Sequence, residues 1–485
     1  MTFKNLDFLK TQAFIGGKWV NATSGASFVV SNPATGDAIA TVTNCDIEDT
    51  KKAIEAADAA FKPWASRTAV QRAQILMRWR ALLLENAHGL AEILTAEMGK
   101  PIAEAVGEIH YGASYLEWYA EEAKRAYGDV IPSTSPTTRT IVIKQPVGVC
   151  AAITPWNFPN AMLMRKAAAA LAAGCTMVAK PAEDTPLSAL ALAALAEKAE
   201  LPAGVLNIVP TTKAADVGLE LTTNPLVRKV SFTGSTGVGK LLLQQAASTV
   251  KKVSMELGGN APFIVFDDAD IDAAVTGAIA SKYRNAGQTC VCANRFFVHS
   301  SVHDEFVSKL SGKVAEFTVG RGDVEGNNVG PLINEAALKK VESLLASALQ
   351  DGASVLVGGK KHDAGTLFFE PTIVTGVQAK MEIANSEIFG PIAPIIVFDD
   401  EDDVVADANN TPYGLAAYIY TQNLGRAWRV GESLDFGMVG INEGIISSVS
   451  SPFGGVKQSG MGREGSKYGL EDYLEIKYLC MGGVQ

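Results

Sequence analysis

The stretch Lys229-Val-Ser-Phe-Thr-Gly-Ser-Thr-Gly-Val-Gly-Lys240 has the pattern of a β-strand, a glycine turn and the start of a helix. We expect the strand over residues 229–233 and the helix from Lys240. Glycine lets the backbone approach a ligand closely, and a helix N-terminus presents unpaired N–H groups to an anion. The run is not Gly-x-Gly-x-x-Gly, however, and no acidic residue for a ribose is evident about 20 residues downstream. A purely structural turn explains the stretch equally well.

The same alternation of strand and helix extends along the chain. Apolar, β-rich runs alternate with Ala/Leu/Glu/Lys-rich runs, which predicts an α/β protein with parallel sheets. Residues 14–19 look like a hairpin, and we place a domain change between about 245 and 260. Helices are expected over 47–60, 69–94, 102–125, 161–173, 188–198 and 271–284. Strands are expected over 140–146, 147–153, 176–179, 205–209, 262–266, 295–299 and, at an edge, 473–479.

Length and composition limit the function classes. A chain of 485 residues exceeds one ordinary core, so two or three domains are expected. The net charge of −10 argues against a general nucleic-acid or anionic-membrane binder. The six cysteines do not suggest a disulfide framework, the N-terminus does not resemble a signal peptide, and the apolar stretch 167–179 is too short for the ~20 residues that span a bilayer. We therefore expect a cytoplasmic protein without a metal site.

Two short motifs carry reactive side chains. Gly287-Gln-Thr-Cys290 presents a thiol beside a glycine turn, and Glu256-Leu-Gly-Gly259 presents a carboxylate. A thiol can attack a carbonyl carbon, and a carboxylate can take a proton from water or from the thiol. The pair suggests chemistry on an aldehyde or acyl group. Taken singly, a buried Cys is usually a small hydrophobe and most Glu are solvated.

Three further motifs are compatible with a nucleotide-dependent enzyme, and each has a structural alternative. Lys180 and Glu183 follow a predicted strand, where they could bind ribose hydroxyls or form a surface ion pair. Asn157, between two prolines, could donate to an oxyanion or cap the following helix. Glu387 and Phe389, on a glycine/proline turn, could hold a sugar and a flat ring, or be a helix end and a core Phe.

These motifs together resemble the aldehyde dehydrogenase superfamily, in its order and over nearly the whole chain. The resemblance also includes residues 14–19, Asn32-Pro-Ala-Thr-Gly36 and Pro452-Phe-Gly-Gly-Val-Lys457. Within the superfamily, residues 284–294, 442–448 and 457–465, with Arg165-Lys166, look like succinate-semialdehyde dehydrogenases. The resemblance implies an α/β fold with a Rossmann-type cofactor domain (1–125 and 143–250) and an α/β catalytic domain (251–465). It also implies a small β extension (126–142 and 466–485) for assembly into a homodimer or homotetramer.

The resemblance also implies residue roles. Cys290 is the nucleophile, Asn157 and the Cys290 backbone N–H hold the oxyanion, and Glu256 activates the water that hydrolyses the thioester. The cofactor is NAD or NADP, and Glu183 favours NAD because a carboxylate repels a 2′-phosphate, whereas Lys180 acts in the opposite direction. The cofactor-binding residues are Thr154, Pro155, Trp156, Lys180, Glu183, Gly234, Ser235, Gly239, Leu257, Glu387 and Phe389.

Arg165 and Arg284 carry the substrate hypothesis. Two guanidinium groups near the thiol would bind a carboxylate at the far end of a short aldehyde. Ser448 could add a hydroxyl, with Ser447 and Ser451 as rivals. The expected substrate is succinate semialdehyde, with glutarate semialdehyde as a close rival. A CoA-acylating aldehyde dehydrogenase and a non-enzymatic scaffold are competing hypotheses, but a scaffold should have lost the reactive residues.

Cys292 departs from the general superfamily, in which one thiol suffices. Alternate residues of an extended loop can bring two Cα atoms near the disulfide range, about 5.5–7 Å. We therefore hypothesise that oxidation joins Cys290 to Cys292 and switches the enzyme off reversibly.

Overall fold

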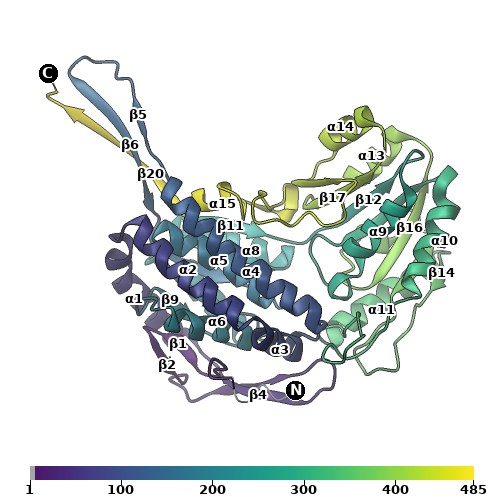
Figure 1. Cartoon of the computed structure of the whole chain (residues 1–485), viewed down its shortest axis with the longest axis horizontal. Helices are drawn as coiled ribbons and strands as arrows, with labels where there is room; N and C mark the ends of the chain where they lie inside the picture. The colour runs from purple at the N-terminus through teal and green to yellow at the C-terminus, as the bar shows by residue number, and fades with distance from the viewer. Residues whose placement is uncertain (1–5, 485) are drawn as a thin grey trace.

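The computed structural model describes residues 6–484, in which two sheets organise most of the chain (Figure 1). The first sheet has the strand order β19-β11-β10-β7-β8-β9-β1-β2, and its strands from β11 to β9 are parallel. The hairpin β1–β2 and the short β19 pair antiparallel at the two edges. The strands are β1 (Ala13–Ile15), β2 (Lys18–Val20), β7 (Val149–Ile153), β8 (Thr176–Lys180), β9 (Leu206–Ile208), β10 (Val227–Thr233), β11 (Lys252–Glu256) and β19 (Gly460–Met461).

Helices cover both faces of this sheet because its central strands are apolar on both sides. In β7, Cys150 and Ala152 pack into one hydrophobic cluster, whereas Val149 and Ala151 pack into another on the opposite face. Such alternation follows from the two-residue period of a strand. One layer consists of α1 (Ile47–Ala65), α7 (Ala214–Thr223) and α8 (Thr236–Ala246). The other consists of α5 (Pro159–Ala173) and α6 (Pro186–Lys198), covered in turn by α2 (Ala69–Glu85), α3 (Ala87–Met98) and α4 (Ile102–Glu122).

Two predicted helices differ from the observed ones. The helix expected over 69–94 is two helices, because the chain leaves helical geometry at Asn86, whose side-chain amide donates to the Leu82 carbonyl at 2.8 Å. The helix expected from Lys240 begins at Thr236, because the Ser235 hydroxyl caps it by accepting from the Val238 N–H at 3.4 Å. Gly237 and Gly239 therefore lie in the first turns of α8, and Gly234 precedes the cap.

The second sheet follows directly in sequence, with the order β14-β15-β16-β13-β12-β17-β18; β14 pairs antiparallel and the other strands are parallel. It begins at β12, and the last parallel strand of the first sheet ends at Glu256, inside the range of about 245–260 where the domain change is expected. The strands are β12 (Ala261–Val265), β13 (Ala293–His299), β14 (Ser354–Val357), β15 (Thr372–Thr375), β16 (Ile392–Phe398), β17 (Ala416–Tyr420) and β18 (Met438–Ile441). The helices of this half are α9 (Ile271–Lys282), α10 (His303–Val314), α11 (Glu335–Gln350), α12 (Glu382–Asn385), α13 (Glu401–Asn409) and α14 (Leu424–Ser433).

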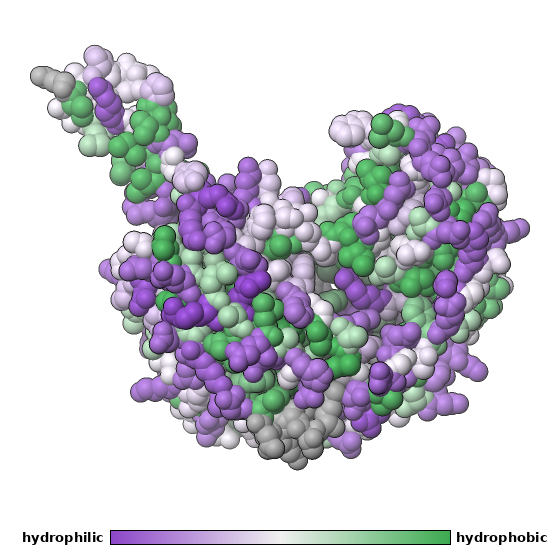
Figure 2. Space-filling model, in the orientation of Figure 1, coloured by the Kyte–Doolittle hydropathy of each residue, from purple (hydrophilic) through white to green (hydrophobic). Residues whose placement is uncertain are grey.

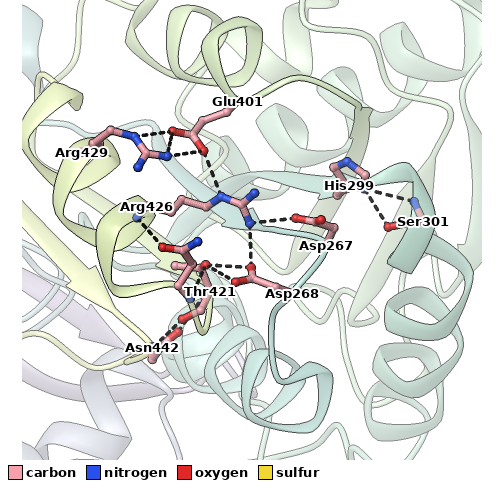
Figure 3. Close-up of polar contacts among 10 residues, drawn as sticks. Asp267, Asp268, His299, Ser301, Glu401, Thr421, Arg426, Arg429 and Asn442 are labelled. Carbon is pink, nitrogen blue, oxygen red and sulfur yellow. Dashed lines mark hydrogen bonds and ion pairs between the residues drawn. The ribbon is translucent and has the colours of Figure 1, made fainter.

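An ion-pair network fixes α14 at the carboxyl ends of β12 and β17 (Figure 3). The Arg426 guanidinium donates to Asp267 and Asp268, both at 2.8 Å, and to Glu401 at 2.9 Å. The Thr421 hydroxyl donates to Asp268 at 2.7 Å. One arginine on α14 thus joins the loop after β12 to the start of α13.

A three-stranded arm projects from the first half of the molecule (Figure 1). It consists of β5 (Asp129–Ile131), β6 (Thr138–Pro146) and β20 (Leu474–Gly482), and β20 pairs antiparallel with β6 along its whole length. The C-terminal strand therefore finds its partner within the chain. Figure 2 shows hydrophobic side chains exposed along the arm. Val130, Ile476 and Tyr478 are among the exposed residues of its strands. The hairpin β3 (Ser27–Ser31) and β4 (Ala38–Thr43) and the short helix α15 (Tyr468–Glu471) complete the fold.

None of the helices found in residues 6–484 combines the length and the apolar character that crossing a bilayer requires.

Candidate active site

A cavity of about 760 Å³ is lined by residues of both halves of the molecule. Asn157, Arg165 and Glu256 reach it from the first half, and Arg284 and Cys290 reach it from the second. The strands of both sheets place loops here: Asn157 follows β7, Glu256 ends β11, and Cys290 precedes β13. Side chains distant in sequence therefore meet at one opening.

A left-handed turn positions Cys290. Asn285, Ala286 and Gly287 have φ values of 54°, 53° and 75°, and positive φ is strained for the Ala. A Cβ at Gly287 would lie 2.2 Å from the Gly390 carbonyl oxygen, so only glycine fits there. The turn ends three residues before Cys290 and directs this half-buried thiol toward the cavity.

Charges of both signs surround the Cys290 thiol. Burial raises the pKa of Cys290 to about 12, and the positive charge of Arg165 opposes this shift most strongly. Glu387 and Glu256 raise the same pKa. The resting sulfur is therefore a thiol that needs a proton acceptor before it can attack.

Glu256 has the environment of a proton acceptor. Its side chain is 3% exposed, and neither carboxylate oxygen has a hydrogen-bond partner within residues 6–484. Burial, and then the neighbouring carboxylate of Glu464, raise the pKa of Glu256 well above its ordinary value, whereas Arg165 and Lys166 lower it. A buried, unpartnered carboxylate of raised pKa binds a proton readily and can return it.

Asn157 is tied to the loop that carries the thiol. Its side-chain amide donates to the Gln288 carbonyl at 3.0 Å, which uses one of its two N–H bonds. Its backbone carbonyl accepts from the Asn285 side-chain amide at 3.0 Å. The alternative interpretation, that Asn157 caps the following helix, does not hold, because the N-cap residue of α5 is Phe158 and no side chain of its own caps it.

Both predicted arginines line the cavity. Arg165 is 2% exposed; its Nε lies 2.8 Å from Glu464, and its guanidinium lies over the Phe453 ring at 3.8 Å. Its Nη2 is buried without a hydrogen-bond partner in the described part of the chain, and so is Nε of Arg284. Such unsatisfied guanidinium groups can bind an anionic group in the cavity.

Ser448 does not line the cavity. Its hydroxyl is exposed and lies 2.9 Å from that of Ser450. Ser447, one of its two rivals, is among the lining residues. Ser447 is therefore the better-placed candidate for the substrate hydroxyl expected from Ser448.

The predicted cofactor residues form two groups. Those that line the cavity are Pro155, Trp156, Gly234, Ser235, Leu257, Glu387 and Phe389. Here Glu387 accepts from the Gly259 N–H at 2.9 Å, and the Trp156 and Phe389 rings meet edge to face at 5.6 Å. The others, Thr154, Lys180, Glu183 and Gly239, lie outside the cavity lining.

The second group still adjoins the first. The Thr154 N–H donates to the Lys180 carbonyl at 3.1 Å, and the Lys180 ammonium lies 3.1 Å from Glu183. A Cβ at Gly239 would lie 2.3 Å from a Leu257 methyl, so glycine allows α8 to approach the Leu257 loop. Lys180 and Glu183 thus form an ion pair, as the structural alternative to ribose binding expects. The pair lies at the carboxyl end of β8, a location that equally suits a ribose.

Cys292 is buried and does not line the cavity. Its thiol donates to the Lys282 carbonyl at 3.3 Å. A bond to Cys290 would require Cys292 to leave this hydrogen bond.

Four charged residues around the site have no role that the sequence alone indicates. Glu464 pairs with Arg165 and Lys166, Glu104 accepts from the Asn285 N–H at 2.9 Å, and Lys100 and Glu108 form a buried ion pair. Lys100 directly follows the glycine that ends α3, and the two glutamates lie on one side of α4. The sequence shows these residues only as charges within otherwise apolar stretches, and such a charge does not by itself identify the residue with which it pairs.

The fold agrees with comparisons to known proteins. Residues 19–479 match the model of the aldehyde dehydrogenase family, and the chain belongs to this family. It is 57% identical to a 3-sulfolactaldehyde dehydrogenase of Pseudomonas putida (100% of this chain, 99% of the relative) and 56% identical to a glutarate-semialdehyde dehydrogenase of Pseudomonas aeruginosa (100% of both). The crystal structure of a succinate-semialdehyde dehydrogenase from Burkholderia pseudomallei superimposes with a TM-score of 0.98 at 58% identity, covering 99% of this chain and 100% of that one. The family and the α/β fold expected from the sequence are confirmed.

Proposed function

We propose that this enzyme oxidises succinate semialdehyde to succinate, with NAD or NADP as the hydride acceptor. The observation that carries the proposal is one cavity that combines a thiol, an unpartnered carboxylate and two guanidinium groups. The thiol and the carboxylate supply the chemistry, and the guanidinium groups select an aldehyde with an anionic tail.

The reaction begins at Cys290. Its sulfur adds to the aldehyde carbon while its proton passes to Glu256, and the resulting oxyanion accepts hydrogen bonds from the second Asn157 N–H and the Cys290 backbone N–H. Glu387 and Phe389 would hold the nicotinamide of a bound cofactor, which would supply the hydride acceptor; loss of the hydride from the carbon would leave a thioester on the Cys290 sulfur. Glu256 releases the thiol proton to solvent and, ionised again, takes a proton from water, whose oxygen attacks the thioester so that the carbon–sulfur bond breaks. The acid leaves, and the sulfur is free again.

The residues around α8 fit a nicotinamide dinucleotide. Gly234 and Ser235 bring the N-terminus of an eleven-residue helix to the cavity, which suits a pyrophosphate. Glu387 and Phe389 would hold the nicotinamide riboside, and Lys180 and Glu183 the adenosine ribose. The exposed Glu183 carboxylate favours NAD over NADP because it repels a 2′-phosphate.

The tail of the substrate would lie between Arg165 and Arg284. Their unsatisfied guanidinium nitrogens can pair with carboxylate oxygens, and Ser447 can add a hydroxyl. Glutarate semialdehyde is the second candidate, supported by the relative that bears this activity in its name. One extra methylene changes burial by only about 0.8 kcal/mol, so both can be substrates. Transfer of the acyl group to CoA is disfavoured because Glu256 can activate water; product analysis with and without CoA tests this.

Steady-state kinetics with R165M and R284M test the substrate proposal. Losing a charge-assisted hydrogen bond costs about 1.5–3 kcal/mol, so kcat/KM for succinate semialdehyde should fall roughly 10- to 100-fold. The value for uncharged butanal should fall less, because butanal is affected only by the weaker ionisation of Cys290. R295M is the matched control, because Arg295 is as buried but donates only to backbone carbonyls. Equal use of butanal and succinate semialdehyde by the wild type would contradict the proposal.

The arm supports assembly into a homo-oligomer, a dimer or a tetramer. The proposed location of the enzyme is the cytoplasm. Exposed apolar side chains on a projecting sheet are typical of an interface. The partner would be a second copy of this chain.

The redox hypothesis for Cys292 remains a proposal. If oxidation joins Cys290 to Cys292, peroxide should inactivate the wild type in a form that thiols restore, and C292A should lose this recovery. Full recovery of C292A would contradict the hypothesis.

A further inference from the structure

A buried ion pair lies behind the loop that carries Asn157. Lys100, between α3 and α4, and Glu108, on α4, have fully buried side chains. The Lys100 ammonium donates to the Glu108 carboxylate at 2.6 Å and to the Asn157 backbone carbonyl at 2.8 Å. It also lies 3.8 Å from the centre of the Phe158 ring. One cation thus contacts two successive residues of the loop.

The second oxygen of Glu108 holds the end of the same loop. It accepts from the backbone N–H groups of Asn160 at 2.9 Å and Ala161 at 3.1 Å. These are orphan donors of the first turn of α5, a helix without a side-chain cap of its own. Glu108 therefore serves as a cap supplied by another helix.

The pair restrains the side-chain amide that this loop presents to an oxyanion. The Asn157 backbone is held by Lys100 and by Asn285, and its side chain is held by the Gln288 carbonyl. Displacing the backbone would move the remaining Asn157 N–H relative to Cys290. A misplacement of about 1 Å can cost on the order of 100-fold in rate.

Stability alone is a weak reason for such a pair. Desolvating two charges costs several kcal/mol, and apolar residues of similar volume often replace a buried ion pair without loss of stability. An apolar pair could not, however, donate to the Asn157 carbonyl or accept from the N–H groups of α5.

We propose that Lys100 and Glu108 are positioning residues of the oxyanion site: they hold Asn157 in place against Cys290 and touch neither the reacting carbon nor the cofactor. The inference rests on the role proposed for Asn157 above. It accounts for a buried charge pair far in sequence from both reactive motifs.

The test compares kcat and KM of K100M, N157A and the double variant K100M/N157A. We expect N157A to lower kcat roughly 100- to 1000-fold, as for the loss of one oxyanion donor. K100M should lower kcat roughly 10- to 100-fold with little change in KM. In the N157A background K100M should add less than about threefold, because both changes remove the same interaction.

Two controls separate positioning from folding. K229M removes another fully buried lysine, which donates to Ser254 outside the cavity, and should leave kcat unchanged. K100M/E108L removes both charges, so it leaves no lone buried ion if K100M alone does not fold; it should keep the wild-type Tm within a few degrees but show the reduced kcat.

The outcomes distinguish the two proposals. An unchanged kcat in N157A overturns the oxyanion role and the inference with it. If N157A lowers kcat and K100M lowers kcat by the same factor in the N157A background as in the wild type, the oxyanion role of Asn157 stands but the inference about Lys100 and Glu108 is overturned. Wild-type kcat in a folded K100M/E108L also overturns it.

Discussion

At the scale of single residues, the reactivity of Cys290 depends on the charges around it. Arg165 is the group that most strongly opposes the burial-driven rise of the Cys290 pKa. Removing this cation should disfavour the thiolate further. The R165M variant should therefore require a higher pH than the wild type for alkylation of Cys290 by uncharged iodoacetamide. The measurement is the rate of label incorporation against pH, with C290A to establish the site; an unchanged or lower midpoint would contradict the geometry.

Single residues also show where sequence reasoning succeeds and where it stops. Cys290, Glu256 and Asn157 lie in separate motifs, and the structure brings them to one cavity. Ser447 lines the cavity and Ser448 does not, a difference that motif spacing alone cannot show for two adjacent loop residues. The sequence does not reveal the role of Lys100, because Lys100 and Asn157 are 57 residues apart and their contact depends on tertiary packing.

At the scale of elements, α4 has a glycine where a helix would favour another residue. Gly107 lies inside α4 and lines the cavity, and a Cβ there would meet nothing within 4 Å. Glycine in a helix costs about 0.5–1 kcal/mol relative to Ala. We infer that the absent side chain leaves room in the cavity.

The G107A variant should be slightly more stable than the wild type, by about 0.5–1 kcal/mol. Its kcat/KM for glutarate semialdehyde should fall more than that for succinate semialdehyde, by up to about fourfold, because the added methyl narrows the cavity. G312A is the control, since Gly312 lies in α10 with equally open space but outside the cavity. G312A should leave the ratio of kcat/KM for the two substrates unchanged. The same ratio in G107A as in the wild type would refute the inference about Gly107.

The boundaries of helices and strands also show how far the apolar pattern of the sequence predicts them. The expected boundaries are close for most central strands, because buried β-rich runs between turns are distinctive. The split between α2 and α3 at Asn86 was missed, because the apolar pattern continues across it. The helix α8 begins before the expected Lys240, because the Ser235 cap starts it at Thr236 and so includes Gly237 and Gly239.

At the scale of the whole molecule, the Arg426 network joins separate parts of the second half (Figure 3). The R426A variant should lower the stability of the protein by about 1–2 kcal/mol, because three partly exposed carboxylates lose their shared cation. R429A, which removes a more exposed arginine paired with Glu401 alone, should lower the Tm less. Equal effects would show that the network does not act as a unit.

The pH dependence of this difference has a defined sign. Burial alone would raise the pKa of Asp268, but the Thr421 hydroxyl and Arg426 outweigh it, so the pKa is lowered in the folded state. A lowered folded pKa contributes stability above the unfolded value of about 3.9 and loses it as the pH falls. The Tm difference between wild type and R426A should therefore shrink below about pH 4.

The arm is the largest-scale feature whose role remains a prediction. Ile476 and Tyr478 lie on one side of β20 and are 74% and 60% exposed. Replacing both with Asp should lower the molecular mass measured by light scattering, because charge on an apolar contact opposes association. L349D adds charge at an exposed apolar residue of α11 and should leave the mass unchanged. A wild-type mass of one chain, or an unaltered mass in the double Asp variant, would contradict the role of the arm.

The central claim is that Cys290 forms a covalent bond with an acid-tailed aldehyde and that Glu256 activates the water that breaks it. The most direct measurement is mass spectrometry of the E256Q variant after mixing with succinate semialdehyde and cofactor. We predict a succinyl thioester on the peptide that contains Cys290, and none in a C290A/E256Q variant. An adduct on Cys292, or full turnover by E256Q without any adduct, would contradict the account.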